Sequence, residues 1–214
     1  MSKGEGIVRQ LEQYFRLSPS PGGLITPPDP QDRIIRPDHL KQGERRAAVL
    51  IPVFTDTDGR NARIMLTRRT EHLRRHAGQI SLPGGSVDPG DRDIIHTALR
   101  EAEEETRLTP ESVTIAGTLP ALIMPTAYHV TPVVGMIRDK VKVEPCPNEV
   151  AEIFFVPADI LLDPSRYQIG SMTFQNRQRK FRELYYEHYR IWGATAAILH
   201  HLAEQLTTSG AKTL

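Results

Sequence analysis

The chain has 214 residues, 39% of them hydrophobic, enough to build one substantial core, so we expect a single domain with an added terminal element. Its 27 lysine and arginine residues nearly balance 26 aspartate and glutamate residues, which excludes a protein that binds nucleic acid over its whole surface but leaves local charged patches open. The single cysteine, Cys146, excludes an internal disulfide framework and a cysteine-rich zinc site, and it fits a reducing compartment.

The N-terminal part predicts a helix followed by an arm. Ile7, Leu11, Tyr14 and Phe15 have helical spacing, so residues 7–17 predict a short amphipathic helix. The prolines and glycines of residues 18–33 favour an extended connection over the surface. Residues 1–6 lack the features of a signal peptide, and no apolar run approaches the ~20 residues that span a bilayer, so we expect a cytoplasmic protein with no membrane contact.

A sheet is predicted to begin after the arm. Residues 47–54 and 62–68 flank a turn-rich segment and indicate a hairpin or adjacent strands. A Gly/Pro loop at residues 82–90 precedes a helix expected from an N-cap at Asp91 to about Arg107. Further segments have the composition of strands, and a terminal helix is expected at residues 191–206: the strand candidates are VTIAGTL, HVTPVVGMI, AEIFFVP and the stretch 167–175.

These elements predict an α+β fold, a mixed β-sheet with helices packed on its faces, because strands outnumber helices and connections are short. We expect an N-terminal helix and proline-rich arm over residues 1–46, a main domain over 47–206 and a tail over 207–214. The early helix and arm are candidates for pairing two subunits into a homodimer.

The most informative stretch is the acidic helix. Residues three and four apart share a helical face, so Glu101, Glu104 and Glu105 are predicted to cluster while Glu103 points elsewhere. Clustered carboxylates repel one another, which opposes folding. A bound Mg²⁺ or Mn²⁺ that bridges them to substrate phosphates would make the cluster favourable. The alternative is a solvated charged helix tied by ion pairs to neighbouring arginines, and the hexapeptide around Glu103 does not by itself decide between the two.

The preceding loop favours the metal site. Its paired glycines, Gly84 and Gly85, permit a tight backbone path and close approach to a metal or phosphate. Loop and helix together resemble the Nudix box, on the residues Gly85, Asp91, Arg100, Glu101, Ala102, Glu104 and Glu105. Three features depart from that box: Asp91 stands where Glu is usual, one extra residue lies between it and Arg100, and Arg107 replaces a glycine near the helix end.

The resemblance implies roles for these residues. Glu101 and Glu105 would be direct ligands of Mg²⁺ or Mn²⁺, and Glu104 a third ligand or a base acting on water. Arg100 would orient the acidic cluster. The implied reaction is attack of a metal-activated water on a phosphorus of a pyrophosphate.

An arginine-rich run precedes the box. It resembles the signature of the coenzyme A pyrophosphatase subfamily, on the residues Leu66, Thr67, Arg69, Leu73, Arg74, His76, Gly78, Pro83, Gly84 and Gly85. With further similarity at residues 129–135 and 191–195, the likeness covers roughly residues 47–206. It implies cleavage of coenzyme A or its derivatives into phosphopantetheine and adenosine 3',5'-bisphosphate, a small-molecule substrate and not a nucleic acid. Substrate contacts are assigned to Arg69, Arg74, His76, Gly84 and Gly85, because arginine forks suit phosphate groups.

Several alternatives stay open. The box selects pyrophosphate chemistry but not the attached group, so another nucleoside diphosphate derivative such as ADP-ribose is one alternative, and a non-catalytic nucleotide- or RNA-binding regulator is another. Glu149 and Glu152 are candidates for a general base outside the helix, although exposed glutamates are common. An alternative for Arg68, Arg74 and Arg75 is that each is an ordinary solvated arginine on the surface. We assign Tyr189 and Trp192 to packing rather than to a platform for adenine.

Overall fold

The computed structural model describes residues 3–29, 45–56, 61–73, 76–124, 128–138, 140–174 and 176–211. Within them, the larger of two sheets is built from eight strands. They are β1 (Arg45–Thr55), β2 (Ala62–Arg69), β3 (Ile80–Ser81), β4 (Gly84–Ser86), β5 (Thr114–Thr118), β6 (Leu122–Ile123), β7 (Tyr128–Ile137) and β8 (Val150–Pro157). The central strand β1 runs parallel to β7 and antiparallel to β2 and β4, so the expected mixed sheet and the expected hairpin are confirmed.

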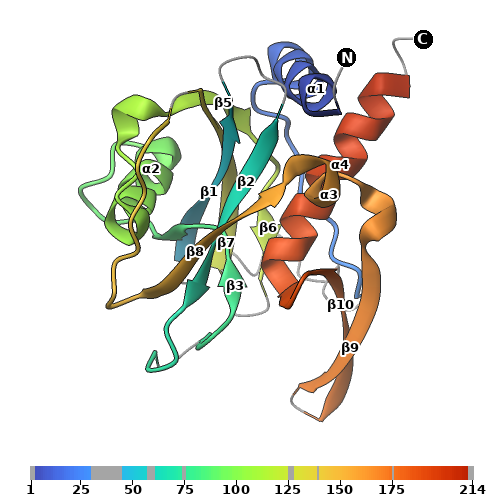
Figure 1. Cartoon of the computed structure of the whole chain (residues 1–214). Coiled ribbons are helices and arrows are strands. Elements are labelled where there is room, and N and C mark those ends of the chain that lie inside the picture. The colour runs from blue at the N-terminus through green and yellow to red at the C-terminus, as the bar shows by residue number, and fades with distance from the viewer. Residues whose placement is uncertain are drawn as a thin grey trace.

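Helices cover both faces of this sheet (Figure 1). Helix α2 (Ile94–Thr106) lies on one face, and α1 (Lys3–Leu17), α3 (Ala158–Leu161) and α4 (Gly193–Ala211) lie on the other, with short 3-10 turns at Pro110–Ser112 and Pro164–Arg166. In β1, Ala48 and Leu50 belong to the core beneath α2, whereas Ile51 and Val53 belong to the core beneath α1 and α4. A strand buried on both faces needs a continuous apolar run, which explains why residues 47–54 show no polar alternation.

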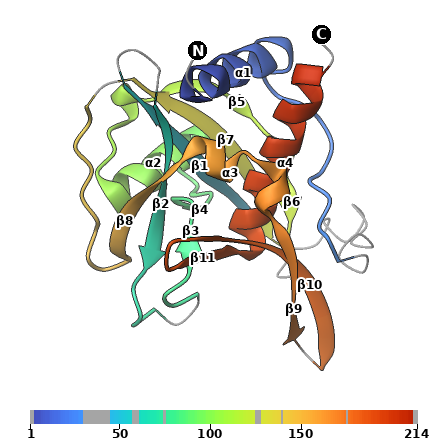
Figure 2. The same ribbon diagram turned by 45° about the vertical axis from the view of Figure 1, so that its right-hand side comes forward.

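A smaller three-stranded sheet was only partly predicted. It contains β9 (Gln168–Phe174), β10 (Arg177–Tyr186) and β11 (Tyr189–Trp192), and its β9–β10 hairpin projects from the body of the molecule (Figure 2). The prediction that the terminal helix begins at residue 191 is wrong, because Ile191 pairs with Leu184 in this sheet and the helix begins at Gly193. Both side chains are buried beside α4, so the apolar periodicity attributed to the helix belonged in part to a strand.

The N-terminal helix is confirmed, and it begins at Lys3. Leu11, Tyr14 and Phe15 are buried in the same core as α4, so α1 is packed onto the main domain. The arm after it runs along β5 and β6, with backbone hydrogen bonds from Thr118 to Pro19 and from Ile25 to Ala121. Residues 30–44 lie outside the description, and the boundary at residue 47 stays a prediction.

Among the described residues, no helix has both the length and the apolar character needed to cross a membrane.

Candidate active site

Helix α2 ends at about Arg107, as predicted, but its N-terminal cap differs from the prediction. Its N-cap is Asp93, whose side chain accepts a hydrogen bond from the backbone N–H of His96 at 2.8 Å; the prediction of Asp91 as N-cap is wrong. At the other end Arg107 adopts the left-handed conformation with φ 60°, and its N–H donates to the carbonyl of Glu103. Glycine normally holds this position because it has no Cβ, which gives a physical reason for the glycine that the Nudix box usually carries there.

Asp91 instead binds Arg100. The Nε and Nη2 atoms of Arg100 donate to the two carboxylate oxygens of Asp91 at 2.9 and 3.0 Å, and Thr97 adds a third hydrogen bond. The Asp91 side chain is 1% exposed, and hydrogen bonds from Arg100 hold its pKa well below the usual range. A buried carboxylate held in this way fixes the loop to the middle of α2.

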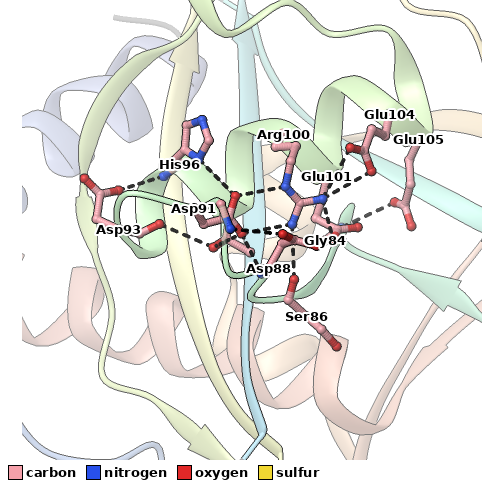
Figure 3. Close-up of polar contacts among 12 residues, drawn as sticks. Gly84, Ser86, Asp88, Asp91, Asp93, His96, Arg100, Glu101, Glu104 and Glu105 are labelled. Carbon is pink, nitrogen blue, oxygen red and sulfur yellow. Dashed lines mark hydrogen bonds and ion pairs between the residues drawn. The ribbon is translucent and has the colours of Figure 1, made fainter.

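Arg100 also reaches the acidic residues, as Figure 3 shows. Its Nη1 lies 3.0 Å from Glu101 and donates to Glu104 at 3.2 Å, and its Nη2 donates to the carbonyl of Ser86 at 3.2 Å. Glu104 is otherwise well exposed, with 60% of its side chain accessible. The implied role of Arg100, orienting the cluster, is therefore compatible with its contacts to the loop and to two of the three glutamates.

Glu101 and Glu105 lie against the glycine loop. A Cβ on Gly85 would collide with the Glu101 carboxylate, and a Cβ on Gly84 would collide with the backbone of Ala48 and Val49. The backbone N–H of Gly84 donates to Glu105 at 3.3 Å. Backbone contact thus requires a glycine at position 84, whereas a side chain at position 85 would displace the Glu101 carboxylate. Strand β4 pairs with β1 on one side and meets the two carboxylates on the other.

Glu105 is an unusual carboxylate because it is 3% exposed. Burial is the main cause that raises its pKa to about 8, and the charges of Glu149 and Glu101 act in the same direction. The charge of Arg69 and the hydrogen bond from the Gly84 N–H act against this rise. Burial also raises the pKa of Glu101. The pair has the electrostatic character of a site that a bound cation would stabilise, since a cation favours both charged forms.

The donor set fits a hard divalent cation in part. Among the residues that the structure describes, no three His, Cys, Asp or Glu side chains converge in a geometry that could hold a metal. Mg²⁺ needs less than that, since it is usually bound through one or two carboxylates, with waters and substrate phosphates completing its shell. Glu101 and Glu105 supply such a pair, and Glu104, turned towards Arg100, would have to rotate to join them.

The two base candidates lie in different places. The carbonyl of Glu149 accepts from the N–H of Thr70 at 3.0 Å, next to Arg69, and its charge raises the pKa of both Glu101 and Glu105. Glu152 instead accepts hydrogen bonds from Arg68 and Tyr189. The structure thus brings Glu149 to the acidic residues and ties Glu152 to a different set of side chains.

Of the predicted substrate residues, Arg69 reaches the acidic site. Its Nη1 lies 3.4 Å from Glu105, and its Nε is buried without a hydrogen-bond partner within the described chain. A buried unpaired guanidinium N–H is costly, and 22% of the Arg69 side chain is exposed beside Glu105. His76, in a left-handed turn, bonds to Gln79, and Arg74 lies outside the described residues.

The sequence reasoning missed the partner of Arg100 and the Tyr189–Glu152 contact. Asp91 was matched to the Nudix box, but its binding to Arg100, nine residues later, depends on how the loop folds against α2. Tyr189 was assigned to packing, which its parallel stacking on Phe154 at 3.7 Å confirms, while its hydroxyl has a polar role that no local pattern signals.

Comparisons with known proteins identify the family of the chain. The NUDIX domain family matches residues 44–175. The chain is 41% identical over 173 residues to an uncharacterized Nudix hydrolase NudL of Pectobacterium atrosepticum, covering 81% of this chain and 87% of that protein, and 38% identical over 180 residues to the protein of the same name in Yersinia pestis, covering 84% and 89%.

Solved structures with similar folds are more distant. A C. elegans Ap4A hydrolase binary complex matches with a TM-score of 0.44 and 22% identity over 53% of this chain and 80% of that one; a MutT/nudix family protein from Enterococcus faecalis matches with a TM-score of 0.49 and 13% identity over 78% and 63%. With the family match spanning more than half of the chain and the NudL proteins most of it, the chain belongs to the Nudix hydrolases, which cleave nucleoside diphosphate derivatives.

Proposed function

We propose that this Nudix hydrolase cleaves the pyrophosphate bond of coenzyme A or its derivatives, with Mg²⁺ or Mn²⁺ held by Glu101 and Glu105 and completed by Glu104. The products would be phosphopantetheine, or its acyl form, and adenosine 3',5'-bisphosphate.

One observation carries the proposal: the arginine-rich run and the acidic helix, which are 36 residues apart at Arg69 and Glu105, meet in the structure. Arg69, from the arginine-rich run, and Gly84, where that run joins the Nudix box, both contact the Glu105 carboxylate, at 3.4 and 3.3 Å. A subfamily signature that reaches the catalytic helix has the position needed to select substrates there.

The bound cation would polarise the scissile diphosphate and lower the pKa of the attacking water. The chain's own residues do the rest. Arg100 holds the loop and the helix in register, and Glu149, whose charge acts on both acidic residues, accepts a proton from the attacking water. Arg69 binds a phosphate oxygen through the exposed part of its guanidinium. Arg74 and His76, from the same run, and the backbone of Gly84 and Gly85 complete the substrate contacts.

A product assay tests this proposal. Coenzyme A, an acyl-coenzyme A, ADP-ribose and NADH are each incubated with enzyme and Mg²⁺ or Mn²⁺, and products are separated by chromatography. We expect the highest kcat/KM for a coenzyme A compound, with adenosine 3',5'-bisphosphate as a product. Faster cleavage of ADP-ribose would overturn the subfamily assignment while leaving the Nudix chemistry in place, and no cleavage of any of them would favour the non-catalytic alternative.

A further inference from the structure

A cleft of about 570 Å³ opens between two edge strands, β3 of the larger sheet and β11 of the smaller. Residues 77–80 line one side and residues 188–190 with Trp192 the other, and Arg68 and Glu152 complete the lining. The volume falls within the range of small-molecule sites. None of the acidic residues of α2 lines it, so it is separate from the site described above.

A chain of contacts holds Arg68 in this cleft. The ring of Tyr189 stacks on Phe154 with an interplanar angle of 7°, its hydroxyl donates to Glu152, and Glu152 accepts from the Nε of Arg68 at 3.0 Å. The hydrogen bond from Tyr189 lowers the pKa of Glu152, and burial together with that bond raises the pKa of Tyr189 to about 12. Near neutral pH, Tyr189 is therefore the donor of this hydrogen bond and Glu152 is its acceptor.

This arrangement leaves the far end of the Arg68 guanidinium for a ligand. Within the described residues its one ion-pair partner is Glu152, which uses Nε. The two terminal amino groups are the fork that binds phosphate oxygens in pairs, and a guanidinium oriented beforehand loses less entropy on binding.

The opposite wall offers a planar surface. The guanidinium carbon of Arg190 lies over Trp192, 5.4 Å from the ring centroid. Arg190 contacts one carboxylate oxygen of Glu183 through Nε at 2.8 Å and through Nη2 at 2.7 Å. Because Glu183 already neutralises Arg190, this wall supplies flat surfaces rather than free charge. Indole rings and guanidinium planes are the surfaces on which nucleobases stack.

The cleft is connected to the acidic site through one strand. Arg68 and Arg69 are consecutive in β2, and the pairing with β8 shifts register between them. Arg68 bonds to Glu152 in the cleft, while Arg69 contacts Glu105 on the α2 side. Consecutive side chains of a strand point to opposite faces, so the two arginines lie on either side of β2 near its end, and the extra residue at the register shift, Ala151, belongs to β8.

We propose that this cleft is a second substrate subsite that binds the phosphorylated nucleoside end of the substrate, with Arg68 on a ribose phosphate and Trp192 beside the base. It rests on the proposed function in that the substrate carries a phosphate besides its scissile diphosphate. Glu152 and Tyr189 are positioning residues that act through Arg68.

The chain supplies its own probe, because Trp192 is its only tryptophan. Metal-free protein is titrated with adenosine 3',5'-bisphosphate, AMP and adenosine, and tryptophan emission is followed. We expect quenching by all three and an affinity for the bisphosphate about tenfold higher than for AMP, as one added charged hydrogen-bond contact provides. Arg68→Ala should abolish that difference.

Matched variants separate positioning from structure. Arg63→Ala is the control, since Arg63 lies on the same strand and stacks on Phe155 instead of lining the cleft; it should bind like wild type. Tyr189→Phe keeps the ring but removes the hydroxyl, so it should weaken bisphosphate binding a few-fold and leave AMP unaffected. Arg68→Ala and Tyr189→Phe should raise KM for coenzyme A more than they lower kcat, whereas Arg63→Ala should change neither.

Two results would overturn the subsite: equal losses of bisphosphate and AMP binding in Arg68→Ala, or ligand binding that leaves Trp192 emission unchanged. Because this titration needs neither metal nor turnover, its outcome is independent of the product assay. Bisphosphate binding without coenzyme A cleavage would retain the subsite and reject the proposed substrate, whereas cleavage without binding in the cleft would do the reverse.

Discussion

Arg100 and Asp91 are joined by two hydrogen bonds that cross from α2 to the preceding loop, Nε to Oδ1 at 2.9 Å and Nη2 to Oδ2 at 3.0 Å. The same arginine extends to Glu101, Glu104 and the carbonyl of Ser86. The position of the acidic residues relative to the glycine loop therefore depends on this pair.

The first prediction concerns the stability that this pair contributes. Asp91→Asn removes the buried negative charge that binds Arg100, so we expect the free energy of unfolding to fall by about 3 kcal/mol, measured by urea denaturation. Since the pKa of Asp91 lies below its ordinary 3.8 in the folded state, the contribution is present above that pH and is lost as pH falls further. Asp88→Asn, in the exposed part of the loop, is the control and should stay within about 0.5 kcal/mol of wild type. A similar small change in Asp91→Asn would contradict the assignment.

The second prediction concerns catalysis by the acidic helix. Glu105→Gln and Glu104→Gln should each lower kcat by orders of magnitude in folded protein, whereas Glu103→Gln, on an exposed side chain, should retain wild-type rates. Circular dichroism establishes folding, and steady-state kinetics with Mg²⁺ or Mn²⁺ gives the rates. Near-normal turnover in both the Glu104 and Glu105 variants would remove the metal-site proposal.

The third prediction is a pH dependence of the metal-free protein. The folded pKa of Glu105, about 8, exceeds the ordinary 4.5, so between these values the folded state binds more protons than the unfolded state, and stability falls as pH rises. Glu105→Gln should flatten that slope and raise stability at the alkaline end. Urea denaturation in chelator across this range measures both effects, and parallel curves for the two proteins would show that the pKa of Glu105 is ordinary.

The fourth prediction distinguishes the two candidate bases. Glu149→Gln should lower kcat and change the acidic limb of the pH–rate profile, because its charge lies beside Glu101 and Glu105. Glu152→Gln should raise KM through Arg68 and leave the shape of the kcat profile as it is. Identical profiles in wild type and Glu149→Gln would exclude Glu149 as the base.

The fifth prediction uses the end of α2. Arg107 occupies a left-handed conformation, which costs a residue with a Cβ about 1–2 kcal/mol. Arg107→Gly should raise the free energy of unfolding by about 0.5–1 kcal/mol, because glycine removes that strain but loses more entropy on folding. Arg107→Ala, which keeps a Cβ, should not. Thermal denaturation of wild type and both variants measures this, and equal stability of the glycine and alanine variants would contradict the prediction.

The sequence by itself determined the features with a local cause. The period of Leu11, Tyr14 and Phe15 identified α1, and the continuous apolar run identified β1. The geometry of a helix predicted that Glu101, Glu104 and Glu105 share one face. The family followed from motifs that are contiguous in the chain. These features depend on residues close together in sequence, and such patterns survive without knowledge of the fold.

Only the tertiary structure decided which groups meet across long separations. Asp91 could cap α2 or bind Arg100, and the choice was made by how the loop folds back; Asp93 took the cap. Glu149 and Glu152 are three residues apart on one segment, yet one lies beside Glu105 and the other beside Arg68, because the turn before β8 and its pairing with β2 send them to different neighbours. The boundary between β11 and α4 was decided in the same way, since Ile191 is buried by strand pairing with Leu184, and burial alone does not distinguish a strand from a helix.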